Sequence, residues 1–187
     1  QLDVDSDFVN TIMSNKGYII EAEDLIAVSA RVIAGNSNQA GLVVSKGLAA
    51  LGTQFRIGAF LNTQAPSYGT VHYTFVSILA TENNTHVSFS DIAPGVILHN
   101  NQLAGNTPDD IILDSGQSFV MAVMGPTEAN RSGLIGSLVS SDKPIAVNCG
   151  SFGGTNGEMG NLDLGFDQIV SAERTGKDYI FIRGTGQ

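Results

Sequence analysis

The residues best suited to binding a metal ion are three acidic side chains in and after the glycine-rich stretch Gly150–Gly160. They are Glu158, Asp163 and Asp167. Carboxylate oxygens are the ligands that Ca²⁺ prefers, so these residues are weak candidates for a calcium site. Their spacing matches neither an EF-hand loop nor a calcium-binding nonapeptide repeat, and solvated loop charges are the alternative interpretation. No other cofactor is expected.

The glycine-rich stretch itself is the best candidate for a binding loop. Its glycines fit neither a phosphate-binding loop nor a dinucleotide fingerprint, because the lysine and the required glycine spacing are missing. We therefore expect an exposed loop that contacts a partner or an ion. The candidate residues are Gly150, Ser151, Gly154, Asn156 and Gly157.

The sequence lacks a recognisable catalytic constellation. Cys149 stands where the first glycine of a G-x-S-x-G nucleophile elbow around Ser151 would be. The three histidines, His72, His86 and His99, show no zinc-ligand spacing. Cys149 is the single cysteine and follows a valine-rich strand, so we expect a buried thiol and no internal disulfide. The chain is predicted not to be an enzyme.

Composition narrows the class of partner. The chain has 18 acidic and 9 basic residues, a net charge of −9 that disfavours nucleic acid and anionic lipid. Since no apolar run approaches about 18 residues, no transmembrane segment is predicted. Only 14% of residues are charged and 22 are glycine, which favours short strands and tight turns over helices.

The elements that must position these residues are short strands. Alternating apolar residues and turn signals predict roughly ten or eleven of them, an all-β fold, as in an antiparallel sandwich, with a propeller-like arrangement as the alternative. Residues 81–85 are interpreted as a hairpin turn between two strands, and Pro144 as the first residue of a strand. Strands are expected near residues 17–21, 25–33, 54–60, 71–79, 86–90, 96–98, 111–113, 119–123, 134–139, 145–147 and 179–182, with a short helical turn within 42–51.

One part of the sequence is repeated. Gly17–Ser29 is similar to Gly136–Asn148 at an offset of 119 residues, so that Ile26 corresponds to Ile145. Gly52–Phe55 is similar to Gly176–Tyr179 at an offset of 124. We therefore expect repeat units in series: residues 1–16 as a lead-in, 17–60 as the end of a preceding unit, and 61–187 as the main unit running into the next. The chain, which begins at Gln1, is expected to be a fragment of a longer one.

Three strand-and-turn motifs resemble those of the IgGFc-binding-protein N-terminal-type domain. In that family "A-T-E-D-N-T-x-V", "L-x-x-G-Q" and "I-x-S-D-K-P-I-A-V" occur in this order. Asn83 stands where the family commonly has Asp. The stretches Gly165–Val170 and Gly176–Ile182 are most similar to bacterial members. The motif matches are Ala80–Val87, Leu113–Gln117 and Ser140–Val147.

The resemblance implies a place outside the cell. The bacterial members are large secreted surface proteins of Bacteroidota, associated with gliding motility and exported by the type IX secretion system. By this resemblance the chain is a non-catalytic structural or adhesive module, and a gliding-motility adhesin is one such role. The implied partners are other domains of the same chain, secretion or outer-membrane anchoring proteins, and surface polysaccharide or glycoprotein. Because Cys149 lacks the partner cysteines of animal members, immunoglobulin binding is less favoured. A specific ligand-binding domain, calcium-dependent and directed at carbohydrate or protein, is the alternative.

Overall fold

The computed structural model describes residues 9–33, 40–59, 73–98, 108–124, 127–154 and 163–180, and this part of the chain is all-β, as expected. Its helical segments are single 3₁₀ turns, η2 (Gly47–Ala50), η3 (Glu128–Arg131) and η4 (Ala172–Arg174). No helix in the described part is long and apolar enough to cross a membrane. The strands of the described ranges are β1 (Ile12–Met13), β2 (Ser29–Ile33), β3 (Ala40–Val44), β4 (Gly52–Arg56), β5 (Tyr73–Ala80), β6 (Thr85–Ser90), β7 (Ile111–Leu113), β8 (Ser118–Met124), β9 (Leu138–Gly154) and β10 (Asp163–Ile169).

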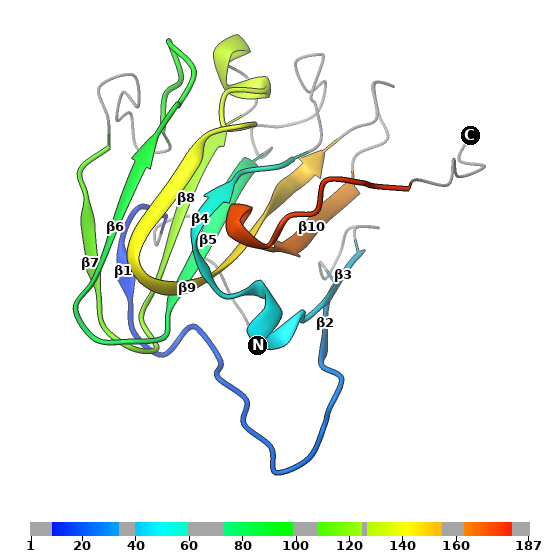
Figure 1. Ribbon diagram of the computed structural model, residues 1–187. Helices are drawn as coiled ribbons and strands as arrows, with labels where there is room; N and C mark the ends of the chain where they lie inside the picture. The colour runs from blue at the N-terminus through cyan, green and yellow to red at the C-terminus, as the bar shows by residue number, and fades with distance from the viewer. Residues whose placement is uncertain are drawn as a thin grey trace.

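Strand β9 organises the main sheet. It has 17 residues and bends sharply, as Figure 1 shows, so its two halves have different neighbours. The first half pairs with β6 on one side and β4 on the other, and the second half pairs with β5 and β10. Every pairing in this sheet is antiparallel. Strand β8 pairs with β5, β1 pairs with β8, and β7 pairs with β6, so these three strands widen the sheet. The bent sheet is nearly closed, which agrees with a sandwich-like architecture.

Strands β5 and β6 do not form the predicted hairpin. Both are antiparallel to β9, so they run in the same direction, one after the other along it. Strands β7 and β8 likewise follow one another along β6 and β5. The polar residues between each pair interrupt a long strand and do not reverse the chain. Residues 81–84 form bends and Thr85 already belongs to β6, so the prediction of a break near residues 81–85 was right and the prediction of a hairpin turn was wrong.

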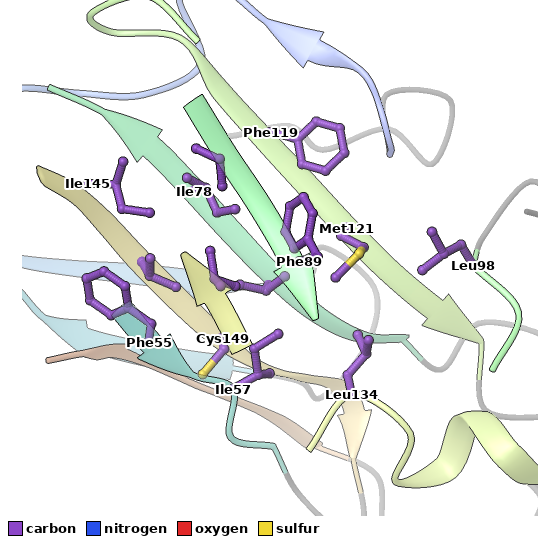
Figure 2. Packing of buried hydrophobic residues seen from close by; sticks show 14 of the residues in the cluster. Phe55, Ile57, Ile78, Phe89, Leu98, Phe119, Met121, Leu134, Ile145 and Cys149 are labelled. Atoms are coloured by element: carbon purple, nitrogen blue, oxygen red, sulfur yellow. The ribbon is translucent and has the colours of Figure 1, made fainter. Parts of the chain in front are cut away.

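The core lies inside the bend. In β6 Val87 and Phe89 are buried and His86 and Ser90 are exposed, as the alternation predicted. The rings of Phe89 and Phe119 lie 5.9 Å apart, and Figure 2 shows them above Met121. The buried cluster draws on β4 to β9, with Phe55, Val76, Ile78, Leu113, Val139, Ile145 and Val147 fully buried.

Several predicted strands are absent or shorter in the described part of the chain. Residues 17–21 form no strand, residues 25–33 form one only from Ser29, and Tyr179 and Ile180 form none. Residues 134–137 form a turn before β9. Val and Ile fit a pleated strand, but a ladder also needs a partner strand, and none lies beside these segments in the described part of the chain.

Strands β2 and β3 form a separate two-stranded sheet. Its inner face packs on β10, where a side chain at Gly41 would lie 2.6 Å from the Phe166 ring. Strand β4, from the range predicted to end a preceding unit, pairs with β9 of the predicted main unit. The division into units is not tested by this pairing and stays a prediction.

Candidate binding surface

The proposed binding loop begins as a strand. Gly150, Ser151 and Gly154 belong to β9, so their assignment to a loop was wrong. Ser151 is fully buried. Gly150 lies against β10, where an added Cβ would be 2.6 Å from the Cα of Phe166. Backbone contact between the two strands therefore explains this glycine. Asn156 and Gly157 lie outside the described residues, so ligand binding by this stretch stays a prediction.

The calcium candidates are only partly visible. Asp167 is bound by Lys46, whose Nζ lies 2.6 Å from its Oδ2. Asp163 is four residues earlier in β10, so its Cα lies about 13 Å from the Cα of Asp167 at about 3.3 Å per residue. In the described part of the chain no three acidic, histidine or cysteine side chains gather around one point. Glu158 lies outside that part, and the calcium site stays a prediction.

An open groove of about 480 Å³ runs between β10 and β4. Its two cations already have acidic partners. Lys46 binds Asp167 and also donates to the backbone oxygen of Gln168. Arg56 lies 2.5 Å from Asp91 and donates to the Gly136 carbonyl at 2.9 Å. These exposed ion pairs neutralise the groove, which is therefore no ready site for an anion.

Cys149 is a buried core residue, as predicted. Its side chain is 4% exposed, and the amide of Gly58 donates to its Sγ at 3.3 Å. Burial raises the pKa of the Cys149 thiol, against a smaller lowering by the Gly58 hydrogen bond. The thiolate is the nucleophilic form, so this cysteine is protected from reaction in the folded protein.

The three family motifs meet where the sheet bends. We call this region the crease and define it as residues 81–84, 114–117 and 142–144. The first segment separates β5 from β6, the second separates β7 from β8, and the third lies in the middle of β9. In the register of the ladders the three segments lie side by side. Sequence reasoning treated them as separate turns and did not foresee that they meet.

Reciprocal hydrogen bonds join the first two segments of the crease. The amide of Ser115 donates to Oδ1 of Asn83, and the amide of Asn84 donates to Oδ1 of Asp114, both at 3.0 Å. An aspartate at position 83, as the family commonly has, would offer the same acceptor oxygen. The asparagine therefore preserves this contact.

The third segment fastens the crease with charged groups. Lys143 Nζ donates to the carbonyls of Asn83 and Asn84 at 2.5 and 3.0 Å. Oδ1 of Asp142 accepts from the amide of His86 at 2.8 Å. Hydrogen bonds that involve ions are stronger than neutral ones, so these contacts hold β5, β6 and β9 at the angle of the bend.

Pro144 lies in the crease, where the ladder along β9 is interrupted. It lies inside β9 and not at its first position, which corrects the prediction. The ladder with β6 ends at Ser141 and the ladder with β5 begins at Ile145, so no partner strand there requires an amide from Pro144. Its carbonyl accepts from the Thr81 hydroxyl at 2.7 Å. A residue without an N–H is tolerated where a ladder is interrupted.

Replacing Asp142 by alanine is expected to lower the free energy of unfolding by about 1 kcal/mol, because the His86 amide loses its acceptor. Asp142→Asn keeps an acceptor oxygen and should cost less. Chemical denaturation of both variants measures the difference. The control is Asp110→Ala, which removes an exposed carboxylate just before β7 and should change stability by less than about 0.5 kcal/mol. Equal effects of all three changes would contradict a role for Asp142 in the crease.

Most of the large exposed apolar side chains belong to one stretch of the sequence. Of the fourteen such residues in the described part of the chain, nine lie between positions 18 and 48. We call these nine the apolar flank. On the outer face of the β2–β3 sheet, Ile33, Leu42 and Val44 surround the exposed Arg31. The remaining members are Tyr18, Ile19, Ile20, Leu25, Ile26 and Leu48.

Exposed apolar residues that share one face, as Ile33, Leu42 and Val44 do on the β2–β3 sheet, are typical of interaction sites. Sequence reasoning did not foresee this exposure, because it assigned residues 17–21 and 25–33 to strands. No nucleophile paired with a base is seen in the described ranges, where Cys149 is buried and His86 lies exposed on β6. The described residues form a β-scaffold that exposes apolar side chains on the β2–β3 sheet.

Comparison with known proteins agrees with a binding role. Residues 42–187 match the family described as IgGFc binding protein. Searches of curated proteins and of solved structures gave no match. The family is one of binding domains and not of enzymes. The match covers 146 of the 187 residues and includes all three segments of the crease. The chain belongs to the IgGFc-binding protein family.

Proposed function

We propose that the chain is a non-catalytic structural and adhesive module of a large secreted cell-surface protein. The observation that carries this proposal is the part of the apolar flank on the outer face of the β2–β3 sheet, where Ile33, Leu42 and Val44 are exposed together, since clustered exposed apolar residues mark interaction sites. Membership of a family of binding domains supports it. A place outside the cell, and a role in gliding motility in particular, are parts of the proposal that rest on the family resemblance.

The outer face of the β2–β3 sheet is the proposed contact surface for the ligand. Leu42 and Val44 are 55% and 53% exposed and point away from β10. Both lie at the start of the family match, and neither contributes to the buried core. The face carries a single charge, that of Arg31. Such a face suits a protein or glycoprotein with an apolar patch bordered by acidic groups.

A binding assay with the immobilised module tests the proposal. Glass, acidic polysaccharide, a secreted glycoprotein and immunoglobulin Fc serve as ligands, the last because of the family's name. We expect binding to at least one, and its loss in the double variant Leu42→Ser, Val44→Ser. The matched control is Ile112→Ser, which changes an exposed isoleucine on β7. Binding to none of the four, or equal binding by both variants, would overturn the adhesive role and leave a spacer.

A further inference from the structure

Each of the two repeated segments has one copy in the core and one copy on the surface. Residues 136–148 and 52–55 are the copies that lie in the core. They supply β9 and β4, which pair with Val139 opposite Phe55 and Leu138 opposite Arg56. Phe55 and Val139 are fully buried. In this pair of copies, therefore, the repeated sequence forms a core ladder.

The other two copies form no strand. The structure describes all of residues 17–28 and 176–180 and assigns no strand to either segment. Ile19 and Ile20 are 56% and 59% exposed, and Ile180 is 95% exposed. In Figure 1 the first segment is the long blue connection below the sheet and the second is the red trace beyond β10, so the two lie apart in one molecule. Each is strand-forming sequence on the surface.

We propose that residues 176–180 of one molecule pair with residues 17–26 of a second copy of this chain, in the register of β4 with β9. The offsets of 119 and 124 residues fix that register. Tyr179 takes the place of Phe55 and lies opposite Ile20, which takes the place of Val139. Ile180 lies opposite Ile19, and Gly176 lies opposite Ile26. The new ladder covers apolar side chains from both copies, in the manner of β-strand addition.

The charges of the two segments also complement each other. In β4 the register shifts between Gly52 and Gln54, so Thr53 has no single opposite residue. Lys177 corresponds to Thr53 and therefore lies opposite the turn at Glu23 and Asp24. The segment of residues 17–29 carries three acidic residues and no basic one. A lysine opposite this acidic turn favours the pairing of residues 176–180 with residues 17–26.

One position opposes the pairing and makes it testable. Asp178 corresponds to Gln54 and lies opposite Glu21, which corresponds to Ser140. Like charges directly opposite each other in a ladder are destabilising. Reversing this charge should therefore strengthen the association more than reversing the exposed Asp110, which lowers the net negative charge of the chain by the same amount.

The contact is heterologous, because each molecule gives a different segment to each neighbour. Such contacts build open chains and not closed two-fold dimers. The inference goes beyond the proposed function by naming a second copy of this chain as the partner of the two segments. The residues involved are distinct from Leu42 and Val44, so ligand binding and self-association can fail separately.

Sedimentation velocity over a range of concentrations tests the inference. We expect the unmodified chain to form a ladder of oligomers as its concentration rises. Ile20→Lys and Ile180→Lys should each weaken association about tenfold or more, since each removes an apolar side chain from the ladder and adds a charge. Ile135→Lys is the control, at an exposed isoleucine remote from both segments in sequence. Asp178→Lys should strengthen association.

A mixture of the two weakened variants gives the sharpest result. Each variant keeps one intact segment, so together they should form a one-to-one dimer and nothing larger. A chain that carries both Ile20→Cys and Tyr179→Cys should form disulfides between molecules and none within one molecule. A chain that stays monomeric at all concentrations, or variants that dimerise equally alone and mixed, would overturn the inference. Circular dichroism of each variant checks that it is folded, as we expect because the changed residues are exposed.

Discussion

Replacing Phe55 by alanine is expected to lower the free energy of unfolding by about 3–5 kcal/mol, the usual cost of truncating a buried aromatic residue. Phe55 is fully buried and belongs to the same cluster as Ile78, Phe89 and Ile145. Figure 2 shows its ring among side chains from other strands. Chemical denaturation followed by circular dichroism measures the loss.

The comparison with Leu48→Ala isolates the effect of burial. Leu48 lies seven residues earlier, in η2, and is 81% exposed, so its truncation should change stability by less than about 0.5 kcal/mol. A single cooperative transition in Phe55→Ala would show that β4 folds together with β9. Two separate transitions, with only the first shifted, would instead favour a boundary near residue 60.

Replacing Gly150 by alanine is expected to cost about 2–3 kcal/mol, near the upper end for overpacking. The new Cβ would clash with the Gly165 carbonyl oxygen and lie 2.6 Å from the Cα of Phe166, and both are backbone atoms that cannot rotate away. Strand β10 would have to separate from β9. Loss of protection of the β10 amides from hydrogen exchange should accompany the loss of stability.

Gly58→Ala is the matched control for this change. Nothing lies within 4 Å of a Cβ placed at Gly58, although its amide touches Cys149, which neighbours Gly150. We expect a change of less than about 1 kcal/mol, with a gain from the reduced freedom of the unfolded chain. Equal destabilisation by the two substitutions would contradict close strand contact as the reason for Gly150.

At the crease, the sequence predicted the break between two strands correctly but predicted a hairpin where the two strands follow one another. Residues 81–84 have the composition of a turn, and they form bends between two strands. A hairpin and an interruption of one long strand need the same residue types locally. The outcome depends on β9, which lies about 60 residues away in the sequence and pairs with both β5 and β6.

Glycine was similarly ambiguous in the stretch after Cys149. Glycine allows both tight turns and close contact between strands. Its abundance predicted a loop, whereas Gly150 and Gly154 lie in β9, paired with β10. Only the position of the second strand distinguishes the two roles.

The sequence by itself determined the all-β class, the family, the burial of Cys149 and the inward face of β6, because alternation and turn chemistry are local properties. The tertiary structure alone decided that Asp167 binds Lys46 and that three distant motifs meet at one crease. It also decided that residues 17–28 stay on the surface while their copy at residues 136–148 leads into the core. The physical reason is that a strand is completed by hydrogen bonds to a partner, and the choice of partner is a property of the whole fold.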